Sequence, residues 1–212
     1  MRIDFVSDVS CPWCAIGLQA LEQALDRLGG EVQVELHLQP FELNPDMPPE
    51  GEDLAHYMAR KYGSRAEEQA ERQALIRQRG AEVGFTFGLR TRVFNTFEAH
   101  RLLHWAALQG RQLELKHALL VAYHGRGENP GSHEVLLRLA GEAGLDVERA
   151  RAVLESGEFA AEVRAKARHW QALGIHSVPS VIIDERHLIQ GGQPVEVFEN
   201  ALREIAAGRA DP

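Results

Sequence analysis

The two cysteines of this 212-residue chain stand three positions apart, in Cys11-Pro12-Trp13-Cys14. Such a pair can help to bind a metal ion, or it can cycle between dithiol and disulfide. A structural zinc site needs four ligands, and the chain has no further cysteine. The nearest histidine, His37, has no second histidine at short spacing. The spacing therefore favours a redox dithiol over a metal site or two unrelated buried thiols, and we expect no metal.

The residues on either side of the pair indicate which elements position it. Residues 2–6 alternate polar and apolar like a strand, and residues 16–28 carry an apolar stripe at helical spacing. The pair thus lies at the start of a helix, where free backbone N–H groups and the helix dipole favour a thiolate. Pro12 suits the first helical turn. We predict that Cys11 is the exposed nucleophile and that Cys14, one turn later and more buried, resolves the mixed disulfide.

The rest of the chain completes a recognisable order of elements. The pattern predicts a strand at 32–38, a proline-rich loop at 42–51, helices nearly throughout 52–173, strands at 177–184 and 187–190, and a helix from Pro194. Without the helical segment, the order is that of a thioredoxin fold, with CxxC beside a βαβ unit. The predicted fold class is therefore α/β, a thioredoxin-like fold with a large inserted all-helical domain. We expect a discontinuous thioredoxin-like domain at 1–45 and 174–212, and the inserted domain at 46–173.

Composition limits the partners. The net charge is −8, and the basic residues of 60–79 alternate with glutamates, which argues against nucleic acid. No apolar run approaches the ~20 residues that span a membrane. Met1 leads directly into a strand without a basic or apolar stretch between them, so we expect no secretory signal and a cytoplasmic protein. In that compartment CxxC is more often catalytic or metal-binding than structural.

Three residues near the pair or the third strand each allow two interpretations. Asp8 could accept a proton from a thiol, or it could cap the loop before Cys11. Trp13 could shield the Cys11 sulfur and contact substrate, or simply pack. Pro179, after Val178, could merely begin a strand, where proline is tolerated.

Several segments beyond CxxC carry a family resemblance. They are Asp4-Phe5-Val6-Ser7-Asp8, Ile16-Gly17, Pro40 to Pro48, Asn95 to Leu102, Ala122-Tyr123, Gly174-Ile175, Val178-Pro179 and Gly191 to Pro194. In combination they resemble the DsbA-like thioredoxin superfamily, and within it the FrnE-type cytoplasmic thiol–disulfide oxidoreductases. The resemblance covers nearly the whole chain. It implies that the helical insertion covers the active-site cleft.

The resemblance also implies roles for the residues around the dithiol. Pro179 would be cis and would face the CxxC across the site. The backbone N–H and C=O of Val178 would bind an extended substrate, as in strand addition. Pro12 and Trp13 would contribute further substrate contacts. The chain departs from the family at two positions that the resemblance places beside the cleft, with Ala15 where the family has an aromatic and Ser180 where it has a bulky apolar residue.

Two other function classes stay open. A sister branch, the 2-hydroxychromene-2-carboxylate isomerases and kappa-class glutathione transferases, is also similar to this chain, but it carries serine at the position of Cys11. The cysteine pair favours redox chemistry, with a glutathione-dependent isomerase or transferase as the alternative. The third class is a non-catalytic binding or chaperone module. No additional cysteine could relay electrons internally.

The predicted partners are proteins with thiols or disulfides, and glutathione. We expect no bound cofactor, and redox coupling to glutathione or to a thioredoxin-type system. Asn95 and Glu98 are spaced as a capping box at a helix start that could line the cleft. His100 and His104 have the spacing of metal ligands on a helix, although a surface or core pair is the simpler interpretation.

Overall fold

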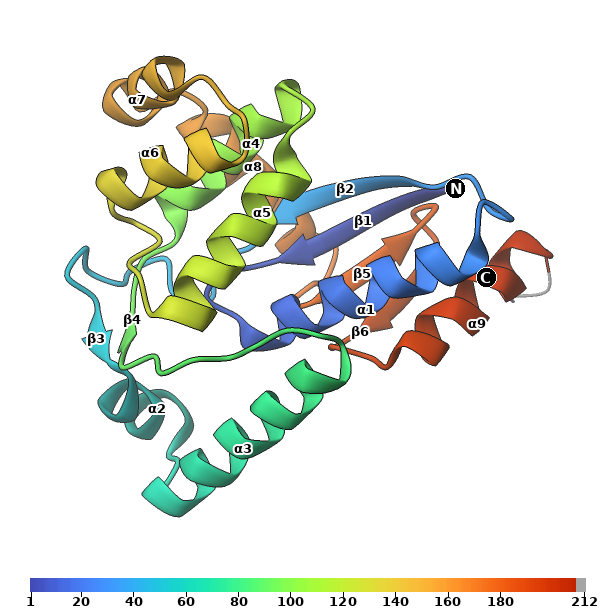
Figure 1. The fold of residues 1–212 in the computed structure, drawn as a ribbon, viewed down its shortest axis with the longest axis horizontal. Helices are drawn as coiled ribbons and strands as arrows, with labels where there is room; N and C mark the ends of the chain where they lie inside the picture. Colours follow the sequence, from blue (N-terminus) through green and yellow to red (C-terminus); the bar gives the residue numbers. More distant parts are fainter. Residues whose placement is uncertain (209–212) are drawn as a thin grey trace.

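A computed structural model describes residues 1–208 (Figure 1). Its central sheet has the strand order β2-β1-β5-β6. Strand β1 (Arg2–Ser7) runs parallel to β2 (Glu35–Pro40) and antiparallel to β5 (Ser180–Ile183), which pairs antiparallel with β6 (His187–Gln190). The sheet therefore joins the two ends of the chain, in the expected thioredoxin-like arrangement. Residues 209–212, the end of the expected second segment, lie outside the described residues.

The register of the sheet brings two loops together. Val6 pairs with Ser180, so the loop that follows β1 and the loop that precedes β5 lie at the same end of the two central strands. Strand β2 begins three residues later than the alternation from residue 32 predicts. The reason is that Arg2, the first residue of β1, pairs with Glu35, and no strand residue is left to pair with the earlier positions.

Two helices cover one face of the sheet (Figure 1). They are α1 (Pro12–Leu28) and α9 (Val195–Ala206), which pack against each other. The apolar side chains on this face belong to one core, which contains Ile3, Phe5, Ile16, Leu18, Leu21, Val181, Ile183, Phe198 and Leu202. Because side chains alternate along a strand, Val6 points to the other face.

The opposite face is packed by α8 (Ala160–Ala172). Its Trp170 joins Val6, Phe41 and Ile182 in a separate apolar cluster. A helix from the segment 46–173 thus belongs physically to the layers of the sheet. The division of the chain at residues 45/46 and 173/174 stays a prediction.

The segment between β2 and β5 is helical apart from one short strand pair. In order it contains β3 (Glu52–Asp53), α2 (Leu54–Tyr62), α3 (Ala66–Glu82), β4 (Arg92–Val93), α4 (Phe97–Leu108), α5 (Gln112–Leu120), a π-helical turn η1 (Val121–Gly125), α6 (His133–Glu142), α7 (Val147–Ser156) and α8. The β3–β4 pair was not predicted, because two residues are too few to show an alternation. Helices α4 to α7 share their own core, separate from that of the sheet. Within residues 1–208, no helix has the length and apolar character needed to cross a membrane.

Candidate active site around Cys11 and Cys14

Cys11 occupies the residue immediately before the first helical residue of α1, with an extended backbone. Strand β1 ends at Ser7, and the turn that follows is closed by a hydrogen bond of 3.2 Å from the Cys11 N–H to the Asp8 carbonyl. Cys14 lies in the first helical turn and is fully buried, whereas Cys11 keeps 5% of its surface exposed. The junction of strand and helix thus places one thiol at the surface of a cleft and the other beneath it.

The two thiols differ in acidity. A hydrogen bond with the Cys14 side chain lowers the pKa of Cys11, and the backbone N–H groups of Cys14 and Trp13 act in the same direction. Burial raises the pKa of Cys14 well above that of a free thiol, and the neighbouring Cys11 adds to the effect. Cys11 is therefore the thiol that ionises first, in the direction expected from the sequence, and Cys14 retains its proton.

The loop before β5 faces the dithiol. The Cys11 thiol donates a hydrogen bond of 3.5 Å to the Val178 carbonyl, and the Val178–Pro179 peptide bond is cis. Pro179 is buried and packs against α1, where a Cβ added at Gly17 would lie 3.0 Å from its ring. Val178 thus presents its backbone to the thiol, and Pro179 lies behind it.

A second glycine allows α1 to approach the loop after β6. A Cβ at Gly192 would lie 2.9 Å from the Trp13 carbonyl oxygen, so this backbone would have to move.

We expect Gly192→Ala to lower the free energy of unfolding by about 1–3 kcal/mol, as overpacking does. Urea denaturation measures the loss. The control is Gly125→Ala, where the nearest atom would be 3.6 Å away; equal losses in the two variants would contradict the close approach.

Cys11 opens into a cavity of about 470 Å³, named here the dithiol cavity. One wall comes from the thioredoxin-like half, and the other comes from α2, α3 and the segments that flank them. Its lining comprises Ser10, Cys11, Pro12, Trp13, Leu43, Asn44, Leu54, Tyr57, Met58, Tyr62, Gln69, Arg72, Gln73, Ile76, Arg90, Val93, His176, Ser177 and Val178. The insertion therefore covers the CxxC face, as predicted. Pro12, Trp13 and Val178 line the dithiol cavity, and Pro179 does not.

Asp8 holds the loop before Cys11 in place. Its fully buried carboxylate accepts hydrogen bonds from the Thr96 hydroxyl (2.7 Å), the Leu43 N–H (2.7 Å), and both the N–H (3.1 Å) and hydroxyl (2.9 Å) of Ser10. Burial alone would raise the pKa of Asp8, but the neighbouring His100 ring, 3.4 Å away, and the backbone N–H donors of Leu43 and Ser10 outweigh burial and lower it far below the usual range. Such a carboxylate is a poor proton acceptor, so this geometry favours the loop-capping interpretation.

Two further polar side chains lie buried close to the site. The Lys116 ammonium, on α5, donates a hydrogen bond of 3.0 Å to the Ser7 hydroxyl, and burial lowers its pKa. Lys116 opposes part of the rise in the pKa of Cys14. His124, in η1, lies 2.8 Å from the Val9 carbonyl through Nε2, and burial lowers its pKa well below the ordinary value. Neither was predicted; the available signal was that Lys116 interrupts the apolar stripe of Leu115 and Leu119.

Other residues singled out in the sequence lie away from the dithiol cavity. Ala15 and Ser180 are fully buried and do not line it, so neither offers a contact to a substrate there. His100 is a core residue whose Nε2 lies 3.4 Å from the Asp8 carboxylate. His104 stacks against Phe159, with 5.1 Å between ring centroids. In residues 1–208, no cluster of three or more His, Cys, Asp or Glu side chains could hold a metal ion.

The capping box predicted at Asn95 and Glu98 is not formed, because α4 begins one residue later than predicted, with Thr96 at its N-cap. The Asn95 side chain, just before the N-cap, accepts a hydrogen bond of 2.8 Å from the N–H of Phe97, the first residue of α4. Glu98 does not reach back to the start of the helix; its carboxylate pairs with Arg101, one turn further along α4. A buried arginine is a stronger partner for this carboxylate than a neutral backbone N–H, because both members of the pair are charged.

Known proteins share this fold and this arrangement of segments. A family model described as the DSBA-like thioredoxin domain matches residues 2–203. The crystal structure of a probable DsbA oxidoreductase from Streptomyces coelicolor is 34% identical and has a TM-score of 0.92, over 100% of this chain and 92% of that chain.

Two more distant structures share the fold. The cytosolic disulfide reductase DsbM from Pseudomonas aeruginosa, solved with GSH, has a TM-score of 0.68, 21% identity and coverage of 98% and 100%. A 2-hydroxychromene-2-carboxylate isomerase has a TM-score of 0.69, 15% identity and coverage of 100% for both chains. With a match over nearly its whole length and a relative above 30% identity, the chain belongs to the DsbA-like thioredoxin domain family.

Proposed function

We propose that this chain is a FrnE-type thiol–disulfide oxidoreductase or isomerase of the cytoplasm, with Cys11 and Cys14 as its redox-active dithiol. The observation that carries the proposal is the asymmetry of the pair. Cys11 lines the dithiol cavity and has a lowered pKa, whereas Cys14 is fully buried with a raised pKa. Disulfide exchange needs an accessible thiolate to attack and a second thiol to resolve the intermediate.

The reaction consists of two displacements at sulfur. The Cys11 thiolate attacks one sulfur of a substrate disulfide, which forms a mixed disulfide and releases the first substrate thiolate. Cys14 then loses its proton and attacks the Cys11 sulfur, which forms the Cys11–Cys14 disulfide and releases the second substrate thiolate. Two electrons and two protons pass in total from the enzyme dithiol to the substrate. Run backwards, the same steps oxidise a substrate dithiol.

The backbone beside Cys11 suits an extended substrate. The Val178 carbonyl already accepts a hydrogen bond from the Cys11 thiol, and Trp13 and Tyr57 offer apolar contact within the dithiol cavity. Substrate proteins are the proposed partners, with glutathione or a thioredoxin-type system to restore the reduced dithiol. Glutathione is supported as one such partner by the structure of the disulfide reductase DsbM, which has the same fold and was solved with GSH.

The test is turnover of insulin disulfides with dithiothreitol as the reductant. We expect the wild-type chain to accelerate precipitation of the insulin B chain, and the double variant Cys11→Ser/Cys14→Ser to have no effect beyond dithiothreitol alone. The reduction potential of the pair, measured in glutathione buffers, then assigns the direction: well above the cytosolic poise for an oxidant or isomerase, and well below it for a reductase. Full activity in the double variant would sink the proposal. Non-covalent glutathione binding that survives in that variant would favour the isomerase or transferase alternative.

A further inference from the structure

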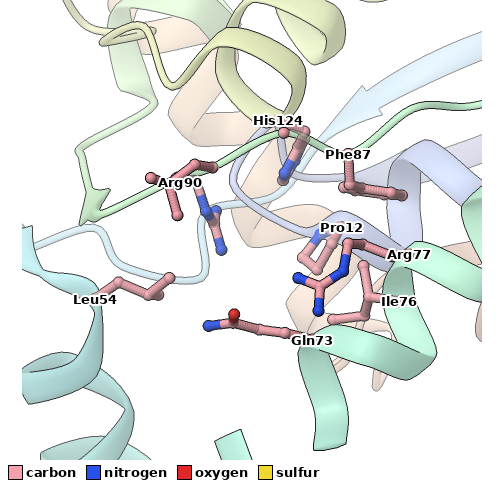
Figure 2. A pocket seen from close by; sticks show the side chains of 10 residues that line it. Pro12, Leu54, Gln73, Ile76, Arg77, Phe87, Arg90 and His124 are labelled. Atoms are coloured by element: carbon pink, nitrogen blue, oxygen red, sulfur yellow. The ribbon is translucent and has the colours of Figure 1, made fainter. Parts of the chain in front are cut away.

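The dithiol cavity continues into a second cavity of about 300 Å³, named here the side cavity. The two share Pro12, Leu54, Gln73, Ile76 and Arg90, so a substrate bound at Cys11 has the side cavity directly beside it. Figure 2 shows the side chains of Gln73, Arg77 and Arg90 reaching into the same space next to Pro12. Polar side chains from α3 and from the segment after it thus converge beside the dithiol.

The charge of this lining is opposite to that of the whole protein. Three arginines, Arg72, Arg77 and Arg90, line the two cavities, and no aspartate or glutamate lines either one within residues 1–208. The chain as a whole has 31 acidic and 23 basic residues and a net charge of −8. In a surface with an acidic excess, a cavity walled by three cations and no carboxylate creates a local positive potential that attracts anions.

Two of the three arginines are available to a ligand. Arg72 and Arg77 are exposed on α3, and in the described part of the chain neither makes a hydrogen bond or a salt bridge. On the same helix, Arg79 pairs with Glu82 at 3.5 Å. Arg65, at its start, pairs with Glu68 at 2.9 Å. The unpaired arginines of α3 are therefore those that face the cavities.

The third arginine is held in a fixed position. The Arg90 guanidinium donates a hydrogen bond of 3.1 Å to the Ser10 carbonyl and stacks over the Tyr123 ring, 4.7 Å from its centroid. The guanidinium is thereby held at Ser10, the residue immediately before Cys11, on the border of both cavities. A guanidinium so held keeps free N–H donors for a carboxylate at little entropic cost.

We propose that Arg72, Arg77 and Arg90 make this enzyme select disulfide substrates with carboxylates next to the reacting cysteine. The proposal rests on the proposed function and adds the charge class of the substrate. Guanidinium groups bind carboxylates in a bidentate manner, and such charge-assisted hydrogen bonds are about twice as strong as neutral ones. A carboxylate two or three residues from the attacked sulfur would lie in the side cavity while that sulfur lies at Cys11.

The experiment measures single-turnover oxidation of the reduced enzyme by three synthetic peptides. Each peptide contains the same internal disulfide, flanked by glutamates, by glutamines or by lysines. The reduced peptide and the Cys11–Cys14 disulfide are the only products, so no further reactant is needed. For the wild-type chain we expect the glutamate peptide to react fastest and the lysine peptide slowest, as read by acid quench, alkylation and mass spectrometry.

Single substitutions then locate the effect. We expect Arg72→Gln and Arg77→Gln each to slow the glutamate peptide by about three- to fivefold, as loss of a partly exposed ion pair would. The glutamine peptide should change by less than about twofold and the lysine peptide should react faster. The matched control is Arg79→Gln, on the same helix with the same change in net charge. At about 0.1 M salt, where the Debye length is about 10 Å, this more distant charge should have little effect.

The possible results separate the charge selection from the disulfide exchange itself. Equal rates for the three peptides with the wild-type chain would overturn the charge selection and leave disulfide exchange intact. A loss in Arg79→Gln as large as that in Arg77→Gln would also overturn it, because the effect would then come from the overall field. A wild-type chain whose dithiol none of the three peptides oxidises, and whose Cys11–Cys14 disulfide none of the three reduced peptides reduces, would overturn the proposed function together with the selection.

Discussion

Cys14→Ser is expected to accumulate a mixed disulfide through Cys11, whereas Cys11→Ser should form none and lose disulfide exchange by more than about a thousandfold. The reason is geometric. Cys11 opens into the dithiol cavity, while Cys14 is fully buried beneath it and can reach only Cys11. Incubation of each variant with a peptide disulfide, followed by non-reducing mass spectrometry, detects the adduct. An adduct on Cys14 in the Cys11→Ser variant would contradict the assignment of the nucleophile.

The same variants test why Cys11 is acidic. The hydrogen bond with the Cys14 side chain is the largest cause of its lowered pKa, and a serine hydroxyl at position 14 can replace that donor. We therefore expect Cys14→Ser to keep a Cys11 alkylation midpoint below the value of about 8.5 for a free thiol. Cys14→Ala, which has no donor, should show a higher midpoint than Cys14→Ser. Midpoints at or above the free value in both variants would revive the glutathione-binding alternative.

Asp8→Asn is expected to lower the free energy of unfolding by about 3–5 kcal/mol, the cost of breaking a buried charged network. The carboxylate joins three segments that are distant in sequence, through its contacts with Ser10, Leu43 and Thr96. An amide group would present its NH₂ to at least one of these donors and leave it unsatisfied. Chemical denaturation measures the change. The control is Asp146→Asn, at an exposed helix start where asparagine caps as well as aspartate.

The stability that Asp8 contributes should also depend on pH. Its pKa in the folded chain lies below that of the unfolded chain, which is about 3.9. A depressed folded-state pKa gives a contribution that is fully present above the unfolded value and is lost as the pH falls through the folded one. The difference in unfolding free energy between the wild-type chain and Asp8→Asn should therefore be constant between about pH 5 and 7 and shrink below about pH 4. A difference that grows as the pH falls would contradict the buried carboxylate.

The sequence by itself determined the fold class and the place of the dithiol. Both follow from short-range patterns: the alternation of residues 2–6, the helical stripe that follows CxxC, and the proline at the first helical position. Local patterns are reliable here because the elements are long enough to repeat their period. They were not reliable at β3 and β4, which have two residues each, or for the start of β2, which the pairing with β1 decides.

Only the tertiary structure decided what surrounds the dithiol. Asp8 meets Thr96 across 88 positions of the chain, and Lys116 meets Ser7 across 109, and no local pattern reports such contacts. In the sequence, Arg72 and Arg77 belong to an ordinary charged helix, and only the packing of the insertion over the CxxC face places them on the dithiol cavity and the side cavity. The physical reason is that the chemistry of a thiol can be inferred from its neighbours in the chain. The substrate it meets depends on groups brought to it from distant segments when the chain folds.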